Sequence, residues 1–127
     1  MSNDISDERW ARGAAKMEEV YGSVVPVVPQ GLMDFADIMV ADCFGDVWDR
    51  DGLDVGQRRL LVMGVIAALG EADTFGIQCK AALEKGELTG DQLREVLIQL
   101  TPYIGYPRAA GLVGVTETVI AEAAAAG

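Results

Sequence analysis

Hydrophobic and polar residues follow one another along this chain with the spacing of amphipathic α-helices. Apolar positions three and four residues apart form helical faces, and glycine or proline residues separate one such segment from the next. The segments cover residues 6–21, 31–44, 54–69, 74–85, 89–102 and 107–123. The pattern therefore predicts an all-α protein, a compact bundle of about six helices.

Residues that favour helix ends mark several of these boundaries. Ser6 is a candidate N-cap, and Thr89-x-x-Gln92 matches a capping box, in which two side chains accept hydrogen bonds from backbone N–H groups of the first turn. Gly45 and Gly86 close two of the predicted helices, because glycine readily adopts the left-handed conformation found at helix C-termini. Between the first two segments, prolines within residues 24–30 predict an extended connector.

Two segments predict how the helices pack. Within residues 31–44 one stripe is expected to enter the core, and it consists of Leu32, Phe35, Ala36, Met39 and Cys43. Residues 60–69, in the helix that Asp54 is predicted to cap, are apolar on nearly every side. A small subunit has little interior in which to bury such a helix, so we expect a second subunit to cover part of it.

Length and charge narrow the class of protein. The 127 residues predict a single domain over residues 1–127, and the net charge of −10 repels phosphate backbones and anionic lipid surfaces. We therefore expect neither nucleic acid nor a membrane as a partner; the acidity favours solubility, or alternatively a cationic ligand. Residues 1–8 lack the pattern of a secretory signal, and residues 60–69 are too few to span a bilayer, so a cytoplasmic location is predicted.

The residue types limit the available chemistry. The chain has no histidine, which excludes imidazole metal sites and histidine-based triads. Cys43 and Cys79 match no C-x-x-C or metal-ligand spacing and are expected to be reduced and structural. Proton transfer would have to come from a carboxylate, tyrosine, lysine, cysteine, bound water or the substrate itself. We predict no metal site and no cofactor.

The most informative stretch runs from Trp48 to Gly105. Its markers are Trp48, Arg50, Gly52-Leu53, Arg58, Ala81-Ala82-Leu83 with Gly86, residues 93–99, and Tyr103-x-Gly105-x-Pro107. On these residues the chain resembles the carboxymuconolactone decarboxylase family, within the alkylhydroperoxidase D-like superfamily, over residues 9–120. The resemblance implies an alkylhydroperoxidase D-like helical fold and a homo-oligomeric ring of subunits, a trimer or a hexamer.

The resemblance also implies which positions carry chemistry. Alignment on Ala81-Ala82-Leu83 places the C-x-x-C pair and histidine of the redox branch at Glu71, Thr74 and Gln78. The same alignment places the E-x-x-x-H pattern of the decarboxylase branch at Thr74 and Gln78, and the superfamily's upstream glutamate near Arg59. The thiols of a peroxidase are therefore missing. Gln78 can still donate a hydrogen bond to a carbonyl or enolate oxygen, although it cannot supply the proton.

The candidate catalytic residues are Gln78 and Tyr103. Gln78 is either a hydrogen-bond donor in a pocket or an ordinary polar group of an interface. Tyr103 either supplies a phenolic proton or orients the substrate, or it fixes the turn at Gly105. The candidate substrate-binding residues are Trp48, Arg50, Arg58, Thr74 and Cys79.

Each binding candidate has a structural alternative. Arg50 and Arg58 are suited to bind a substrate carboxylate through two hydrogen bonds, or else anchor a loop and a helix end through salt bridges. Trp48 is either a packing anchor or a surface on which a ligand stacks. Arg59 and Arg94 have the pattern of solvated or interface charges.

Three functions remain open at this point. The first is a cofactor-independent enzyme of the lyase or decarboxylase type, acting on a small lactone, carbonyl or carboxylate compound. The second is a non-catalytic small-molecule-binding or assembly protein on the same scaffold. The third, a thiol-dependent peroxidase, requires Cys43 and Cys79 to meet in space.

Overall fold

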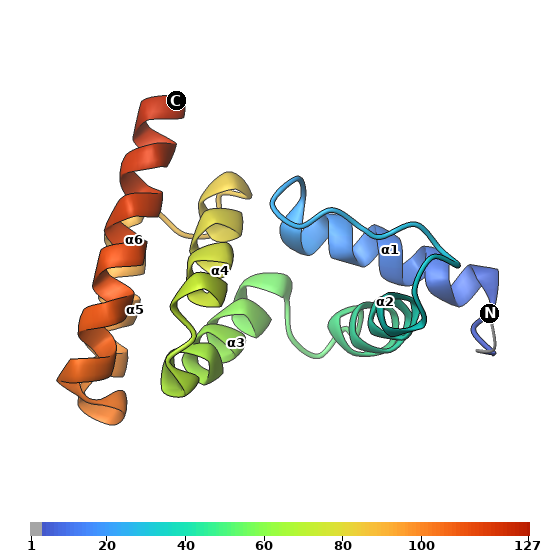
Figure 1. Cartoon of the computed structure of the whole chain (residues 1–127), viewed down its shortest axis with the longest axis horizontal. Helices are drawn as coiled ribbons and strands as arrows, with labels where there is room; N and C mark the ends of the chain where they lie inside the picture. Colours follow the sequence, from blue (N-terminus) through green and yellow to red (C-terminus); the bar gives the residue numbers. More distant parts are fainter. Residues whose placement is uncertain (1–3) are drawn as a thin grey trace. The chain divides into compact units, whose positions relative to one another are not determined.

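The fold was analysed in a computed structural model, which describes residues 4–127. Every regular element in this range is helical, which confirms the predicted all-α class (Figure 1). The elements are α1 (Asp7–Tyr21), α2 (Asp34–Ile38), the π-helical segment η1 (Met39–Trp48), α3 (Val55–Leu69), α4 (Ala72–Glu84), α5 (Gly90–Ile104) and α6 (Tyr106–Ala126). Residues 1–3, at the start of the polar N-terminal segment, lie outside the described residues.

The chain divides into two compact units, Met1–Val55 and Gly56–Gly127. The single domain expected over residues 1–127 stays a prediction.

In the first unit, α1 packs against η1 at close range. Ser6 is the N-cap of α1, as predicted, and its Oγ accepts a hydrogen bond from the Arg9 backbone N–H at 3.2 Å. A methyl group on Gly13 would lie 1.9 Å from the Val40 carbonyl oxygen, so the two helices can approach this closely only with glycine at that position. Ion pairs tie the same helices together at the surface: Asp46 carboxylate oxygens lie 2.7 Å from Arg9 and 3.0 Å from Arg12.

The second predicted helix differs from the structure in both its end and its buried face. Gly45 does not close it, because the helix continues through Gly45 to Trp48 with π-helical hydrogen bonding. The wider turn of a π-helix moves the buried stripe away from the one that α-helical spacing predicts. The buried positions are Ala36, Asp37, Val40, Ala41, Phe44, Gly45 and Trp48. Leu32 and Phe35, predicted in the core, are 71% and 75% exposed.

The second unit has its core where helices α3 to α6 pack together. The buried side chains at its centre include Met63, Phe75, Cys79, Leu93 and Leu112. In Figure 1, α4 runs beside α6, and the two helices are in extensive contact.

Two predicted helix ends are confirmed in this unit. Thr89 and Gln92 form the capping box, with hydrogen bonds of 3.1 and 2.9 Å to backbone N–H groups. Gly86 follows α4 with a φ of +69°.

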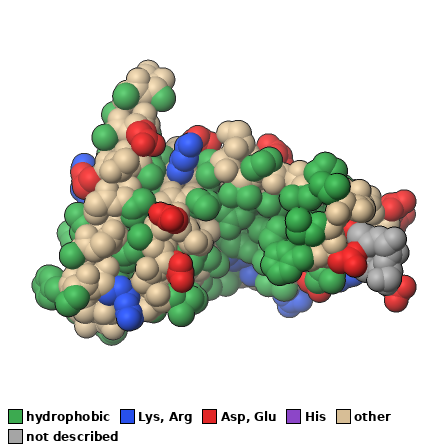
Figure 2. All heavy atoms as spheres, viewed as in Figure 1, with side chains coloured by type: hydrophobic (Ala, Val, Ile, Leu, Met, Phe, Trp, Pro, Cys, Tyr) green, Lys and Arg blue, Asp and Glu red, His purple; other side chains and the backbone are tan. Residues whose placement is uncertain are grey.

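Helix α3 is only partly covered. Met63, Ile66 and Ala67 face the core, whereas other apolar side chains of the helix remain in contact with solvent. These exposed residues are Leu60, Leu61, Val65 and Leu69, of which Leu69 is 68% exposed. Hydrophobic side chains are exposed on the face of the molecule that Figure 2 shows. The chain alone therefore does not surround α3 on most sides.

Helix α6 has a length and a composition that bear on the predicted location. Tyr106–Ala126 is long and apolar enough to cross a membrane by length and composition, and it is the one such helix among residues 4–127. This is weak evidence, because core helices of soluble proteins pass the same test. Two of its charged residues bind neighbouring helices: Glu117 pairs with Arg94 of α5 at 2.8 Å, and Arg108 donates to the Ala68 carbonyl. The cytoplasmic location stays a prediction.

Candidate functional site

Gln78 occupies the buried face of α4. The helix turns Phe75, Gln78, Cys79 and Ala82 toward the interior, and Gln78 is 2% exposed. A buried amide must have hydrogen-bond partners, because losing its hydration without replacement is costly. Its Oε1 accepts a hydrogen bond of 2.9 Å from Nη1 of Arg59 on α3. The site is therefore built where α3 and α4 bring two polar side chains together inside the second unit.

Arg59 is fully buried, so its interpretation as a solvated or interface charge is wrong. Its guanidinium binds Glu87 through one edge of the planar group: Nε lies 2.9 Å from Oε2, and Nη2 lies 2.8 Å from the same oxygen. Nε is also 3.1 Å from Oε1. A buried guanidinium needs such a counter-charge, because an uncompensated charge in the interior strongly destabilises the folded state. The burial of Arg59 could not be predicted from the sequence. Arg58 and Arg59 are adjacent and identical, and the apolar residues that follow them in α3 do not indicate which of the two is buried.

Glu87 completes the network and was not singled out from the sequence. It lies in the turn between α4 and α5, directly after Gly86, and its backbone N–H donates to the Ala82 carbonyl at 2.9 Å. This hydrogen bond fixes the start of the turn, and the Glu87 side chain is 16% exposed. No local motif signals its role, because its partner Arg59 is 28 residues away.

The network sets the orientation of the Gln78 amide. Arginine carries five N–H donors and no acceptor, so the group that faces Arg59 must be the amide oxygen of Gln78. The assignment of oxygen and nitrogen follows from this partner. The two Nε2 hydrogens of Gln78 are consequently directed away from Arg59. An amide N–H is a donor suited to an oxygen that carries or develops negative charge.

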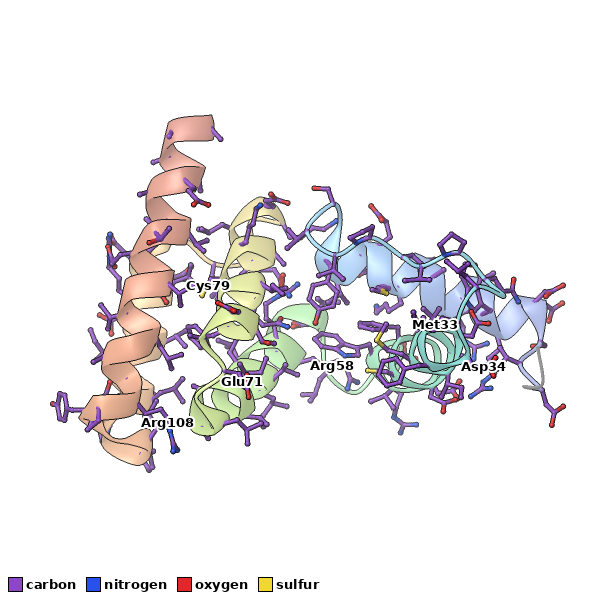
Figure 3. All side chains as sticks on the ribbon, in the orientation of Figure 1. Met33, Asp34, Arg58, Glu71, Cys79 and Arg108 are labelled. Carbon is purple, nitrogen blue, oxygen red and sulfur yellow. The ribbon has the colours of Figure 1, made fainter. Side chains whose placement is uncertain are left out.

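Cys79 follows Gln78 on α4 and is also buried (Figure 3). Its Sγ lies 3.8 Å from Oγ1 of Thr116, whose hydroxyl donates to the Leu112 carbonyl at 2.8 Å. Burial raises the pKa of the Cys79 thiol to about 11. A thiol with this pKa is protonated near neutral pH, whereas disulfide chemistry requires a thiolate. Burial also raises the pKa of Cys43, in the first unit; both cysteines are free thiols.

Two predicted binding residues belong to the first unit. Trp48 is buried at the end of η1 and stacks on Phe44, with ring centroids 6.0 Å apart and an interplanar angle of 19°. Phe44 in turn meets Tyr21 edge to face at 5.8 Å. This packing favours the anchoring role of Trp48 over ligand stacking. Arg50 is exposed in the loop that follows η1.

The other predicted residues lie in the second unit. Arg58 is half-buried in the first turns of α3 (Figure 3), and Thr74 is exposed one turn before Gln78. Tyr103 is 81% exposed near the end of α5, so it does not pack into the turn at Gly105. The second unit therefore brings Gln78 together with Arg59 and Glu87, two residues outside the predicted set, and leaves Tyr103 at the surface.

Two surface grooves lie within the second unit, each with a volume of about 490 Å³. One lies between α4 and the end of α6 and is lined by residues that include Lys80, Leu83, Glu122 and Ala123. The other lies between α3 and α5, with a lining that includes Leu60, Val96 and Ile98. Gln78 lines neither groove. Among residues 4–127, no three or more cysteine, aspartate or glutamate side chains gather in the way a metal site requires.

The chain is therefore all-helical, with a network of glutamine, arginine and glutamate side chains inside its second unit. Comparison with known protein families shows to which family the chain belongs. The carboxymuconolactone decarboxylase family model matches residues 33–118, and the chain belongs to this family, as the resemblance indicated.

Two named relatives are decarboxylases. The chain is 30% identical over 86 residues to 4-carboxymuconolactone decarboxylase of Acinetobacter baylyi, which covers 68% of this chain and 63% of that protein. It is 27% identical over 108 residues to nitrosuccinic acid decarboxylase of Metarhizium robertsii, with coverage of 85% and 72%. The chain thus spans less than two thirds of the length of the Acinetobacter protein.

Proposed function

We propose that this protein is a decarboxylase of the lyase type that needs no cofactor and acts on a small carboxylic acid. The observation that carries the proposal is the buried Gln78, whose amide oxygen is held by Arg59 at 2.9 Å. Family membership and the two decarboxylase relatives support the reaction class. In the alignment with the family pattern, Thr74 and Gln78 occupy the positions of the acid and the histidine, so we infer that the Gln78 amide performs part of the role of the histidine.

The names of the relatives narrow the substrate class. Both describe a carboxylic acid that also carries an oxygen-containing group, a lactone in one case and a nitro group in the other. Groups of this kind accept an electron pair from a neighbouring carbon. We therefore infer that the substrate is a small acid with a lactone, carbonyl or comparable acceptor close to the carboxylate that leaves.

The reaction then has two steps. The bond between carbon and the carboxylate breaks, carbon dioxide leaves, and the electron pair moves to the acceptor oxygen as an enolate or an equivalent anion. An N–H of Gln78 stabilises that oxygen while its charge develops. A proton then adds to the carbon, and Tyr103 or water supplies it, since a glutamine amide is no acid in this range.

Other residues bind and orient the substrate in this proposal. Arg58, on α3 of the same unit as Gln78, binds a carboxylate group of the substrate, for which the planar guanidinium is suited; whether Arg50 of the first unit also binds one is tested by an Arg50→Ala variant. Thr74 and Cys79 flank Gln78 along α4 and shape the space beside it. In the first unit, Trp48 has an anchoring role, because its stacking on Phe44 fixes the end of η1.

We also propose that the protein works as a homo-oligomer, a trimer or a hexamer as in the family resemblance. The exposed apolar side chains of α3 support this: Leu61 and Val65 are each 62% exposed, and Leu69 is 68% exposed. Contiguous exposed apolar residues favour association. Light scattering on the wild type and on the double variant Leu61→Glu, Val65→Glu tests this proposal. An assembly that falls apart in the double variant supports the proposal, and a monomeric wild type contradicts it.

A second candidate is a non-catalytic binding or assembly protein on the same scaffold. The observation that favours it is the absence of Gln78 from both grooves described for residues 56–127. Soaking crystals with lactones, keto acids and nitro acids separates the candidates. Ligand density beside the Gln78 amide supports the enzyme, and a site that stays filled by protein side chains supports the assembly protein.

Turnover is tested with the isosteric variant Gln78→Glu. This change keeps an oxygen that can face Arg59 but replaces the N–H donors by a second carboxylate oxygen. We expect carbon dioxide release to fall strongly at neutral pH and to recover partly at low pH, where a protonated Glu at this position can donate again. Activity equal to that of the wild type across the pH range contradicts a donor role for Gln78.

A further inference from the structure

Helix α1 is attached to η1 by ion pairs at the surface of the first unit. Arg9, Arg12 and Lys16 follow one another three and four residues apart, so they share one face of α1. Their partners are three carboxylates of η1 and of the residue that follows it: Asp42, Asp46 and Asp49. We call these six residues the α1–η1 ion-pair network.

The carboxylates of this network are shared between cations. Asp46 lies 2.7 Å from Arg9 and 3.0 Å from Arg12. Asp49 lies 3.9 Å from Arg12 and 3.8 Å from Lys16. The carboxylate side chains of the network are 39% to 57% exposed, so salt in the solvent screens their charges. Single exposed pairs contribute little to stability, whereas several that share partners contribute together. The attachment of α1 therefore depends on ionic strength.

The part of the contact that salt does not screen is small. The buried residues of α1 are Gly13, Met17 and Val20, in a helix of 15 residues. Arg12 adds a hydrogen bond of 3.2 Å to the Gly45 carbonyl. A helix of this length is only marginally stable in water without packing against a neighbour. Once α1 leaves η1, its backbone hydrogen bonds therefore lose their protection.

Trp10 of α1 carries a cost in the attached state. Its Nε1 is buried and has no hydrogen-bond partner among the residues that the structure describes. A buried donor without a partner destabilises the folded state, because it has lost its hydration without replacement. We expect separation of α1 from η1 to return this N–H group to water. The cost at Trp10 and the small apolar contact both favour separation when the ion pairs weaken.

We propose that α1 is a releasable helix. The α1–η1 ion-pair network holds it on η1 at low ionic strength, and screening of the network by salt releases it while the second unit stays folded. Residues 22–33 keep the released helix attached to α2. Release uncovers the apolar face of η1 that includes Val40 and Phe44.

Hydrogen–deuterium exchange followed by mass spectrometry tests the release, because amides of α1 exchange when the helix opens locally. The wild type is compared at low and high sodium chloride concentration with the double variant Asp46→Asn, Asp49→Asn, which removes both shared carboxylates. The control variant is Glu117→Gln, which removes one charge of the exposed pair Arg94–Glu117 in the second unit.

A second readout is the fluorescence emission of Trp10. The chain has two tryptophans, so a Trp48→Phe background leaves Trp10 as the one emitter. Phenylalanine keeps an aromatic ring beside Phe44, on which Trp48 stacks. Transfer of the Trp10 indole to water should move its emission to longer wavelength.

The expected result is local opening of α1. Raising the salt concentration from about 0.05 M to about 1 M shortens the range of charge interactions to about 3 Å. We expect the α1 amides to exchange about tenfold faster or more at high salt, whereas amides of α4 to α6 keep their rates. The Asp46/Asp49 variant should exchange fast already at low salt, and Glu117→Gln should behave as the wild type. The Trp10 emission should shift over the same salt range.

Two results overturn the proposal. One is α1 exchange in the wild type that does not change between low and high salt. The other is a rise in exchange that the amides of α4 to α6 share, because this indicates global unfolding. The salt series uses the unmodified chain, so it decides the question even if the Asp46/Asp49 variant does not fold.

Discussion

Removing Glu87 tests whether the buried network is energetically coupled. In Glu87→Met the guanidinium of Arg59 keeps its burial and loses its counter-charge. Breaking a buried ion pair in this way costs about 3–5 kcal/mol. Arg59→Met should cost less, because Glu87 is 16% exposed and can regain water, whereas Arg59 is fully buried. In the double variant apolar side chains replace both charges, and its stability should return to within about 2 kcal/mol of the wild type.

Urea unfolding followed by circular dichroism measures the four proteins of this cycle. The exposed partner Glu117 is the matched control, and Glu117→Met should lose much less stability than Glu87→Met. The reasoning is refuted if Glu87→Met costs less than about 1 kcal/mol, or if the two single losses simply add in the double variant.

Three further predictions concern other parts of the chain. Hydrogen bonding to Arg9 lowers the pKa of Asp46 below its usual 3.8, so the stability from this ion pair is present at neutral pH and is lost as pH falls through the lowered pKa. The acid-unfolding curves of the wild type and of Asp46→Asn should therefore converge at that pH. Curves that stay parallel would contradict this prediction. Because burial raises the pKa of Cys79 to about 11, a thiol reagent at pH 8 should modify Cys79 only after unfolding. Mass spectrometry of the labelled protein measures this modification. Rapid modification of the folded protein would contradict the burial of the thiol. Gly13→Ala places a methyl group 1.9 Å from the Val40 carbonyl oxygen and should lower the free energy of unfolding by about 1–3 kcal/mol or more. Gly111→Ala, with open space around the residue, should not lower it. Equal melting temperatures for the two variants would refute the close contact of α1 with η1.

Features set by neighbouring residues could be predicted from the sequence. The Ser6 N-cap and the Thr89–Gln92 capping box involve residues three apart, so a short stretch contains all the partners. Gly86 follows the same logic, because a left-handed position requires only the residue itself. The helical class and the family resemblance follow from many such local signals together.

Features that depend on distant partners could not be predicted. Arg59 and Arg58 are adjacent and chemically identical, and only the fold decides that Arg59 meets Glu87, 28 residues away. The contact between α1 and η1 also joins distant residues, because Gly13 of α1 leaves room for the Val40 carbonyl, whereas Phe35 of α2, predicted in the core, stays exposed. Gln78 was identified through the family pattern, but its amide orientation follows from Arg59.

The central claim is that the buried Gln78 amide supports decarboxylation. Release of carbon dioxide from a panel of lactone, keto and nitro carboxylic acids, measured with wild type and Gln78→Glu side by side, tests it most directly. The account predicts turnover of at least one acid by the wild type and a large loss at neutral pH in the variant. Equal turnover by both proteins, or no carbon dioxide from any acid of the panel, would contradict it.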